Sequence, residues 1–179
     1  MPAAKKSVRS TAPRTPRPPA KQKESATRVL RQFRIVFNTV KTHFRQVERS
    51  AGLAGAQVWA LSVIRDAPGI TVNDLAAAMD VHQSTASNLL RALVARKLVV
   101  KKTGDDKRTV RLHILPAGVR ALGRAPAPFA GLLPTALTAL DPRTLARLEK
   151  DLGALIASLD VDEEAGSIPL GQRAPRART

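Results

Sequence analysis

The 179-residue chain contains no cysteine. Disulfide bonds, thiolate metal sites and peroxide sensing through a thiol are therefore excluded. No apolar run approaches the roughly 18 residues needed to span a bilayer. The N-terminus is basic but has no apolar stretch after its basic residues, which argues against a secretory signal. These absences favour a reducing, cytoplasmic compartment and no membrane segment.

Acidic residues are scarce. Lys and Arg number 30 against 14 Asp and Glu, which gives a formal net charge of +16. Such an excess of positive charge indicates a polyanionic partner, either nucleic acid or an acidic membrane surface.

Motifs for catalysis and metal binding are also missing. The sequence has no P-loop, GxGxxG or GxSxG motif. Its three histidines, His43, His82 and His113, do not stand in an HxxxH spacing, and a metal site needs several converging ligands. We therefore expect no enzyme activity, no cofactor and no metal site. A metal site formed between two copies of the chain is a disfavoured alternative.

The composition divides the chain into five segments. Residues 1–24 are rich in Pro, Lys and Arg and are predicted to be a disordered basic tail, either simply solvated or lying along phosphate backbones. Residues 25–52 form an amphipathic helix with apolar residues at steps of three and four. Residues 53–118 form a small domain, residues 119–160 form further helices interrupted at Pro126 and Pro128, and residues 161–179 are a disordered tail.

The apolar helices at both ends suggest an assembly element. The first helix carries three of the four phenylalanines, and Leu145, Leu148, Leu152, Leu155 and Leu159 recur like a coiled-coil seam after the strong start signal Asp141-Pro142. These residues could pack within one chain. We favour a homodimer, because their apolar surface exceeds what a small domain can cover.

The stretch from Thr71 to Leu115 is the most informative. A short helix pattern, a turn at residues 80–82 and a second helix pattern from Gln83 are followed by two β-like runs around a polar tip. Thr71 and Asp74 match a capping box, and Ile70 could pair with the β-ribbon. This order predicts a winged helix-turn-helix, which places one helix in a DNA major groove.

The helix from Gln83 has a buried stripe and a polar face free of acids. Residues able to contact bases or phosphates on this face are Gln83, Ser84, Ser87, Asn88 and Arg91. A merely solvated face more often carries Glu and Lys, whereas this chain has no acid between Val81 and Thr103. The pattern therefore favours DNA contact.

The β-ribbon adds a second set of cations. Its candidate DNA contacts are Lys101, Lys102, Lys107 and Arg108, and Arg111 also lies on it. Asp105 and Asp106 are good turn formers. Asp106 could also brace Arg108 while the guanidinium enters a narrow minor groove.

Residues 57–118 resemble the MarR family of bacterial transcription regulators. The matching pieces are Gln57–Leu61, Pro68–Val72, Asp74–Ala76, Ser84–Ser87, Leu93–Val99, Asp106–Arg108, Val110–Leu112 and Pro116–Gly118. Each piece is weak alone, but together they stand in order and at the family's spacing. Ala54 and Leu115 depart from the pattern, because the family usually has a capping Thr at both positions.

The resemblance implies a mainly α fold with a small β-wing. A winged helix-turn-helix lobe would be joined to N- and C-terminal helices that form a dimerisation region. The helix from Gln83 would be the recognition helix, Arg108 the minor-groove arginine and Asp106 its brace. The family also implies a small aromatic ligand bound between the lobe and the dimer base, where His43 or Trp59 could contact it.

Two functions follow from these features. The first is a dimeric, sequence-specific regulator, most often a repressor in such families, acting on double-stranded DNA in the cytoplasm at the nucleoid. The alternative is an architectural, nucleoid-associated protein that coats DNA with little sequence preference. A membrane-surface role would use the basic residues of the first helix, but its apolar face has the character of a dimer seam.

Overall fold

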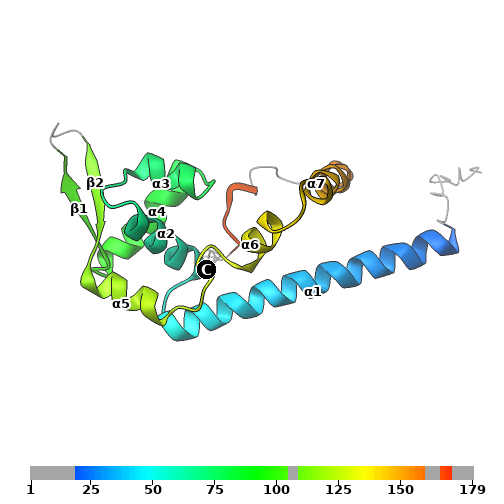
Figure 1. Cartoon of the computed structure of the whole chain (residues 1–179), viewed down its shortest axis with the longest axis horizontal. Helices are drawn as coiled ribbons and strands as arrows, with labels where there is room; N and C mark the ends of the chain where they lie inside the picture. The colour runs from blue at the N-terminus through cyan, green and yellow to red at the C-terminus, as the bar shows by residue number, and fades with distance from the viewer. Residues whose placement is uncertain (1–18, 105–108, 160–165, 171–179) are drawn as a thin grey trace, which may run out of the picture. The chain divides into compact units, whose positions relative to one another are not determined.

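The computed structural model describes residues 19–104, 109–159 and 166–170 (Figure 1). The elements along the chain are α1 (Ala20–Ala51), α2 (Gly55–Asp66), α3 (Val72–Ala78), α4 (Gln83–Ala95), β1 (Val99–Thr103), β2 (Val110–Ile114), α5 (Pro116–Arg124), α6 (Leu132–Thr138) and α7 (Pro142–Ala157). Two compact units are distinguished, residues 1–35 and residues 36–179. We call the second unit the lobe.

Helix α1 begins earlier than its sequence pattern indicates. The prediction of a disordered tail through residue 24 is wrong for residues 20–24, which are helical. The backbone N–H groups of Gln22 and Lys23 donate to the carbonyl of Pro19, so the first turn starts directly after the prolines. Ala, Lys, Gln and Glu have high helix propensity and need no apolar partner to extend a helix. Residues 1–18 of the predicted tail lie outside the described part of the chain.

The lobe is built on one hydrophobic core. Val58, Leu61 and Ile64 of α2 are completely buried, as their helical spacing predicts. The core also takes in residues on both sides of the predicted 53–118 domain: Val47 and Ala51 of α1, and Ala121 and Leu122 of α5. The folded domain is therefore larger than residues 53–118. Side chains of α1 and α5 are needed to complete the core that surrounds α2.

The helix-turn-helix begins at a capped terminus. Thr71 Oγ1 accepts a hydrogen bond from the Asp74 backbone N–H (3.2 Å) and donates one to Asp74 Oδ2 (2.7 Å). Leu75 and Met79 are buried as predicted. The turn to α4 passes through Asp80 in the left-handed region at φ 49°, which Asp tolerates better than most residues.

Replacement of Thr71 by alanine should lower the free energy of unfolding by about 1 kcal/mol, because one orphan backbone donor of α3 loses its acceptor. Thermal and urea denaturation measure this loss. Serine keeps the hydroxyl, so Thr71→Ser is the matched control and should retain most of the stability. Equal stability of the alanine and serine variants would show that the cap contributes nothing.

The wing is a two-stranded antiparallel ribbon. Its register runs from Val99 opposite Ile114 to Thr103 opposite Val110. Ile70 forms a bridge to Leu112, which confirms the predicted pairing of this short edge with the ribbon. The Gly69 N–H donates to the Leu112 carbonyl (2.9 Å), and the Leu112 N–H donates to the Ile70 carbonyl (3.0 Å). The base of the wing is thus tied to the turn that precedes α3.

The two helix starts without a capping Thr are held in other ways. At α2, the backbone N–H of Ala54 donates to Gln57 Oε1 at 3.2 Å. At α5, Leu115 makes no side-chain cap, but its N–H donates to the Leu98 carbonyl (2.9 Å) and Pro116 occupies the first turn. Proline there is favourable because its missing N–H would have no helical partner.

The C-terminal helices follow the breaks in the sequence. Helix α5 ends at Arg124, before the two prolines, and α6 resumes at Leu132, as predicted. Asp141 caps α7 by accepting hydrogen bonds from the N–H groups of Arg143 and Thr144. The Thr144 side-chain hydroxyl and these backbone N–H groups favour the carboxylate, so they lower the pKa of Asp141. No residue of α7 is buried within the described structure, and Leu159 lies beyond its end.

The predicted disorder of residues 161–179 is wrong for residues 166–170. They form a short turn in which Pro169 and Leu170 line an apolar hollow beside Trp59. Ile168, Pro169 and Leu170 give this part of the tail the apolar surface that its charged neighbours lack. Across the described residues, no helix has the length and hydropathy required to cross a membrane.

Candidate nucleic-acid interface

Helix α4 presents two chemically distinct faces. Ala86, Leu89, Leu90 and Leu93 are buried in the core of the lobe, and Val94 is half-buried. On the other side, the side chains of Gln83, Ser84, Asn88 and Arg91 are exposed, and Ser87 is partly exposed. The structure therefore brings all five predicted α4 residues to the surface of one helix. No acid stands on this helix to repel a phosphate.

Asn88 and Arg91 are coupled. Arg91 Nη1 donates a hydrogen bond to Asn88 Oδ1 at 3.0 Å, across the i, i+3 spacing at which helical side chains meet. In this pair the outward-facing groups are the Asn88 amide N–H groups and the remaining guanidinium N–H groups. Both are donors. The pair therefore suits base edges that present acceptors, such as O6 and N7 of guanine.

Gln83 is held by a residue that sequence reasoning missed. Its Nε2 donates to Asn73 Oδ1 at 2.8 Å, so the start of α3 fixes the orientation of the first side chain of α4. Asn73 is itself exposed and could make polar contacts of its own. No sequence signal marks Asn73 as this partner, since Gln83 lies ten residues further along the chain.

The N-terminus of α4 offers backbone donors. His82 occupies the capping position but makes no side-chain hydrogen bond to the helix. The N–H groups of the first turn, with the helix dipole behind them, favour an anion such as phosphate. Ser84 lies in this turn with its hydroxyl exposed, where it can add a further donor.

Lys101 and Lys102, the two wing lysines that the structure describes, lie on opposite faces of the ribbon. Lys101 is opposite Leu112 in the ribbon, whereas Lys102 is opposite Arg111, and neighbouring residues of a strand point to opposite faces. Like charges directly opposite each other are destabilising, so Lys102 and Arg111 gain from a nearby anion. Arg111 Nη1 also donates to the Gly69 carbonyl (3.2 Å). Asp106, Lys107 and Arg108 lie outside the described residues.

The two candidate ligand contacts line different hollows. Trp59 lines an apolar hollow of about 60 Å³ together with Val40, Phe44, Pro169 and Leu170. His43 is buried, and its Nε2 lies 3.2 Å from the Pro128 carbonyl oxygen. It borders a separate open groove lined mainly by polar residues of α1. One small ligand in either hollow would therefore not touch both residues.

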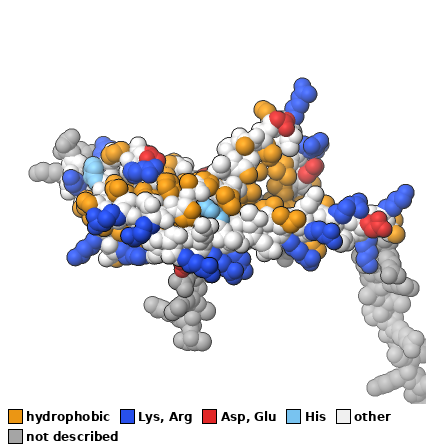
Figure 2. Space-filling view, turned by 60° about the horizontal axis from the view of Figure 1, so that its bottom comes forward, with side chains coloured by type: hydrophobic (Ala, Val, Ile, Leu, Met, Phe, Trp, Pro, Cys, Tyr) orange, Lys and Arg blue, Asp and Glu red, His pale blue; other side chains and the backbone are white. Residues whose placement is uncertain are grey.

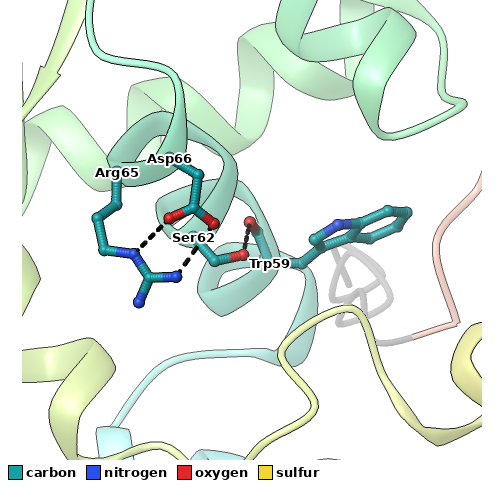
Figure 3. Close-up of polar contacts among 4 residues, drawn as sticks. All are labelled: Trp59, Ser62, Arg65 and Asp66. Carbon is teal, nitrogen blue, oxygen red and sulfur yellow. Dashed lines mark hydrogen bonds and ion pairs between the residues drawn. The ribbon is translucent and has the colours of Figure 1, made fainter.

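The C-terminal end of α2 carries an exposed ion pair (Figure 3). Arg65 makes two hydrogen bonds to Asp66, with Nε–Oδ1 at 2.7 Å and Nη2–Oδ2 at 3.0 Å. The hydrogen bond from Arg65 lowers the pKa of Asp66. The Arg65 guanidinium lies 5.4 Å from the centre of the Phe129 ring, which connects α2 to the segment before α6. The Trp59 indole points away from this pair (Figure 3).

These features define a class of protein. A capped three-helix unit of α2, α3 and α4, an antiparallel ribbon and an acid-free exposed face on α4 together make a winged helix-turn-helix. A crystal structure of Staphylococcus aureus MepR with DNA has a TM-score of 0.50 at 20% identity, covering 72% of this chain and 94% of that one. A MarR family transcription regulator has a TM-score of 0.51 at 19% identity, covering 77% and 91%. At sequence identities of 20% and 19%, the similarity to these two structures establishes the fold of this chain.

The model of the MarR family matches residues 51–109, which include α2 to β1 and end directly before the wing's second strand. A curated relative, a putative transcriptional regulatory protein for the hcr operon from Thauera aromatica, is 35% identical over 81 residues. That match covers 45% of this chain and 49% of the relative, so the chain spans about half the length of that protein. The fold class expected from the sequence is confirmed, and the expected resemblance to the MarR family is confirmed over residues 51–109.

Proposed function

We propose that this protein is a DNA-binding transcription regulator and not an enzyme. The observation that carries the proposal is the exposed face of α4, where five residues suited to bases and phosphates stand without an acid. A helix of this kind reads base edges in the major groove, while phosphate contacts fix its register. Lys101, Lys102, Lys107 and Arg108 of the wing supply further cations.

We further propose that it binds a pseudo-palindromic operator as a homodimer and acts as a repressor. Apolar side chains remain exposed on α1, among them Val29, Leu30 and Phe37. On α7, Leu155 and Ile156 are more than 40% exposed. Exposed apolar surface of this extent marks an interface, and a second copy of the chain carries matching helices. Two recognition helices would then read half-sites about one DNA turn, roughly 10 bp, apart.

A small aromatic ligand remains a proposal, with Trp59 as its better supported contact. The hollow at Trp59 is apolar, but its volume of about 60 Å³ is well below the roughly 150 Å³ of a cavity that admits benzene. A ligand would therefore have to displace part of the lining. The lining residues that belong to no helix or strand are Ala130, Gly131, Pro169 and Leu170. These two short segments are therefore the parts that would move. The polar groove at His43 suits such a ligand less well.

The direct test is a gel shift and footprint on the DNA upstream of the protein's own gene, at several salt concentrations. We expect protection of one site of two half-sites, with an affinity at least about a thousand-fold above that for unrelated DNA. Sequence-blind, length-dependent binding would contradict the proposal.

The architectural alternative rests on the net charge of +16 and the basic first segment. Deletion of residues 1–22 separates the two functions. A regulator keeps its preferred site and loses part of its overall affinity, whereas a DNA-coating protein loses most of its binding. As a DNA-binding protein, it would act in the cytoplasm at the nucleoid.

A further inference from the structure

Helix α1 has a basic side that packing of the lobe leaves free. In its second half, Val40, His43, Val47 and Ala51 are buried against the lobe. The opposite side carries Lys41, Arg45 and Arg49, all exposed. A spacing of four residues places them about 6 Å apart along the helix axis. Glu48 is the one acid between residues 36 and 51.

Helix α5 repeats this arrangement. Gly118, Ala121 and Leu122 are buried, whereas Arg120 and Arg124 are exposed on the opposite side. The helix contains no acid. Ala51 of α1 and Ala121 and Leu122 of α5 belong to the core of the lobe, and Figure 1 shows the second half of α1 and α5 along the lower side of the lobe. Figure 2 turns the lower side of Figure 1 forward, and Lys and Arg are spread over this face while Asp and Glu are few.

The recognition face of α4 does not account for these cations. Both α1 and α4 bury one side in the same core and turn the other outward. In Figure 1 the second half of α1 and α5 lie along the lower side of the lobe, whereas α3 lies at its upper side. Five exposed cations on two acid-poor helix faces repel one another unless an anion lies near them.

We propose that Lys41, Arg45, Arg49, Arg120 and Arg124 form a second DNA-binding surface, which holds the phosphate backbone of a duplex without reading its bases. We call it the α1/α5 basic surface. Four of its five cations are arginines, whose planar guanidinium suits bidentate contact with phosphate. A regularly spaced row along α1 matches an extended polyanion better than a single small anion.

A lipid surface fits these residues less well. Helices that lie on membranes insert an apolar side beneath their basic residues. Along residues 40–51 that apolar side is already buried in the lobe, with Val40 and Val47 at 8% and 2% exposure. Binding there would rest on charge alone, which is the kind of contact that a duplex backbone provides.

The inference rests on the proposed function and extends it from one duplex to two. A chain that reads an operator with α4 and holds a second backbone with the α1/α5 basic surface connects two DNA segments. The protein would then bring a distant segment to its operator and form a loop.

The test is a capture assay with the full chain. A duplex containing the footprinted site is fixed to beads, protein is added, and retention of a labelled duplex without the site is measured. The test variants are Lys41→Gln/Arg45→Gln/Arg49→Gln, Arg120→Gln/Arg124→Gln and all five changes together. The control is Arg143→Gln/Arg147→Gln/Lys150→Gln, which neutralises three exposed cations of similar spacing on α7.

We expect the five-residue variant to reduce capture at least about ten-fold and each partial variant to reduce it by a smaller factor. Binding to the fixed site should stay within about three-fold of the wild type. The slope of log K against log salt for the second duplex should become shallower by about 0.9 for each phosphate that is no longer neutralised. The α7 control should capture like the wild type, and circular dichroism should show the same helical content for all variants.

Unchanged capture by the five-residue variant overturns the proposal, as does an equal reduction in the α7 control. Sedimentation with phosphatidylserine vesicles supplies a further arm. If the five changes abolish vesicle binding and leave capture intact, the surface serves a membrane and the proposal is wrong. A failure of the proposed function would look different, because the wild type would then give no footprint on the fixed duplex.

Discussion

Replacement of Asn88 and Arg91 together by alanine should weaken binding to the operator by about 30-fold or more per lobe. A good bidentate contact with a base contributes about 1–3 kcal/mol of discrimination, and the double variant removes every donor that the Asn88–Arg91 pair offers to a base. Binding to unrelated DNA should fall far less, because that binding depends mainly on the phosphate contacts. Fluorescence anisotropy titrations with operator and scrambled duplexes, at equal salt, measure both values.

The hydrogen bond between the two side chains adds a sharper expectation. Because Arg91 donates to Asn88 Oδ1, removal of either side chain releases the other from its oriented position. The two single variants should therefore each show most of the effect of the double variant, and a double-mutant cycle should give a coupling of at least about 0.5 kcal/mol.

Arg143→Ala is the matched control, since it removes one exposed cation from a helix outside the winged module. Unfolding temperatures should be unchanged in all these variants, because both α4 side chains are exposed. Equal reductions on operator and scrambled DNA would contradict a base-reading role for the pair.

Replacement of Gly118 by alanine should lower the free energy of unfolding by about 2–3 kcal/mol, at the upper end for an overpacked site. An added Cβ would lie 2.5 Å from the Leu98 carbonyl oxygen and 2.7 Å from Ile114 Cγ1. The first contact is with backbone and cannot be relieved by a rotamer change. Thermal unfolding followed by circular dichroism should show a fall in Tm of about 5–10 °C.

Gly123 is the internal control for this prediction, since it lies on the same helix and a Cβ there meets nothing within 4 Å. Gly123→Ala should be neutral or stabilising by up to about 1 kcal/mol, because alanine is the better helix former. If both variants behave alike, helix propensity and not close packing governs the two sites.

The elements that follow from local rules were predictable from the sequence. Leu89, Leu90 and Leu93 recur at helical spacing, and all three are buried on α4. The Asp141 cap with its following proline marks the start of α7, as seen. Such signals depend on neighbours within a few residues, so no knowledge of the tertiary structure was needed to interpret them.

Pairings between distant segments were not predictable in the same way. The bonds from Gln83 to Asn73 and from Arg111 to the Gly69 carbonyl depend on where the helices and the ribbon come to rest. The burial of His43 against Pro128 joins residues 85 positions apart. The start of α1 is hard to predict for another reason: Pro and Lys in the preceding residues are typical of a solvated tail, while residues 20–24 still have high helix propensity.

The attachment of the wing to the turn before α3 has a mechanical consequence. Two backbone hydrogen bonds with Gly69 and Ile70, and a third bond from the Arg111 guanidinium to the Gly69 carbonyl, join its base to the segment that leads into α3. These bonds fix the base of the wing relative to the start of α3, so the wing does not pivot about its base. Under the proposed function, a duplex whose minor groove lies at another distance from the α4 contacts would have to bend or twist to fit. The elastic cost of that deformation then selects among sequences at positions that no side chain touches.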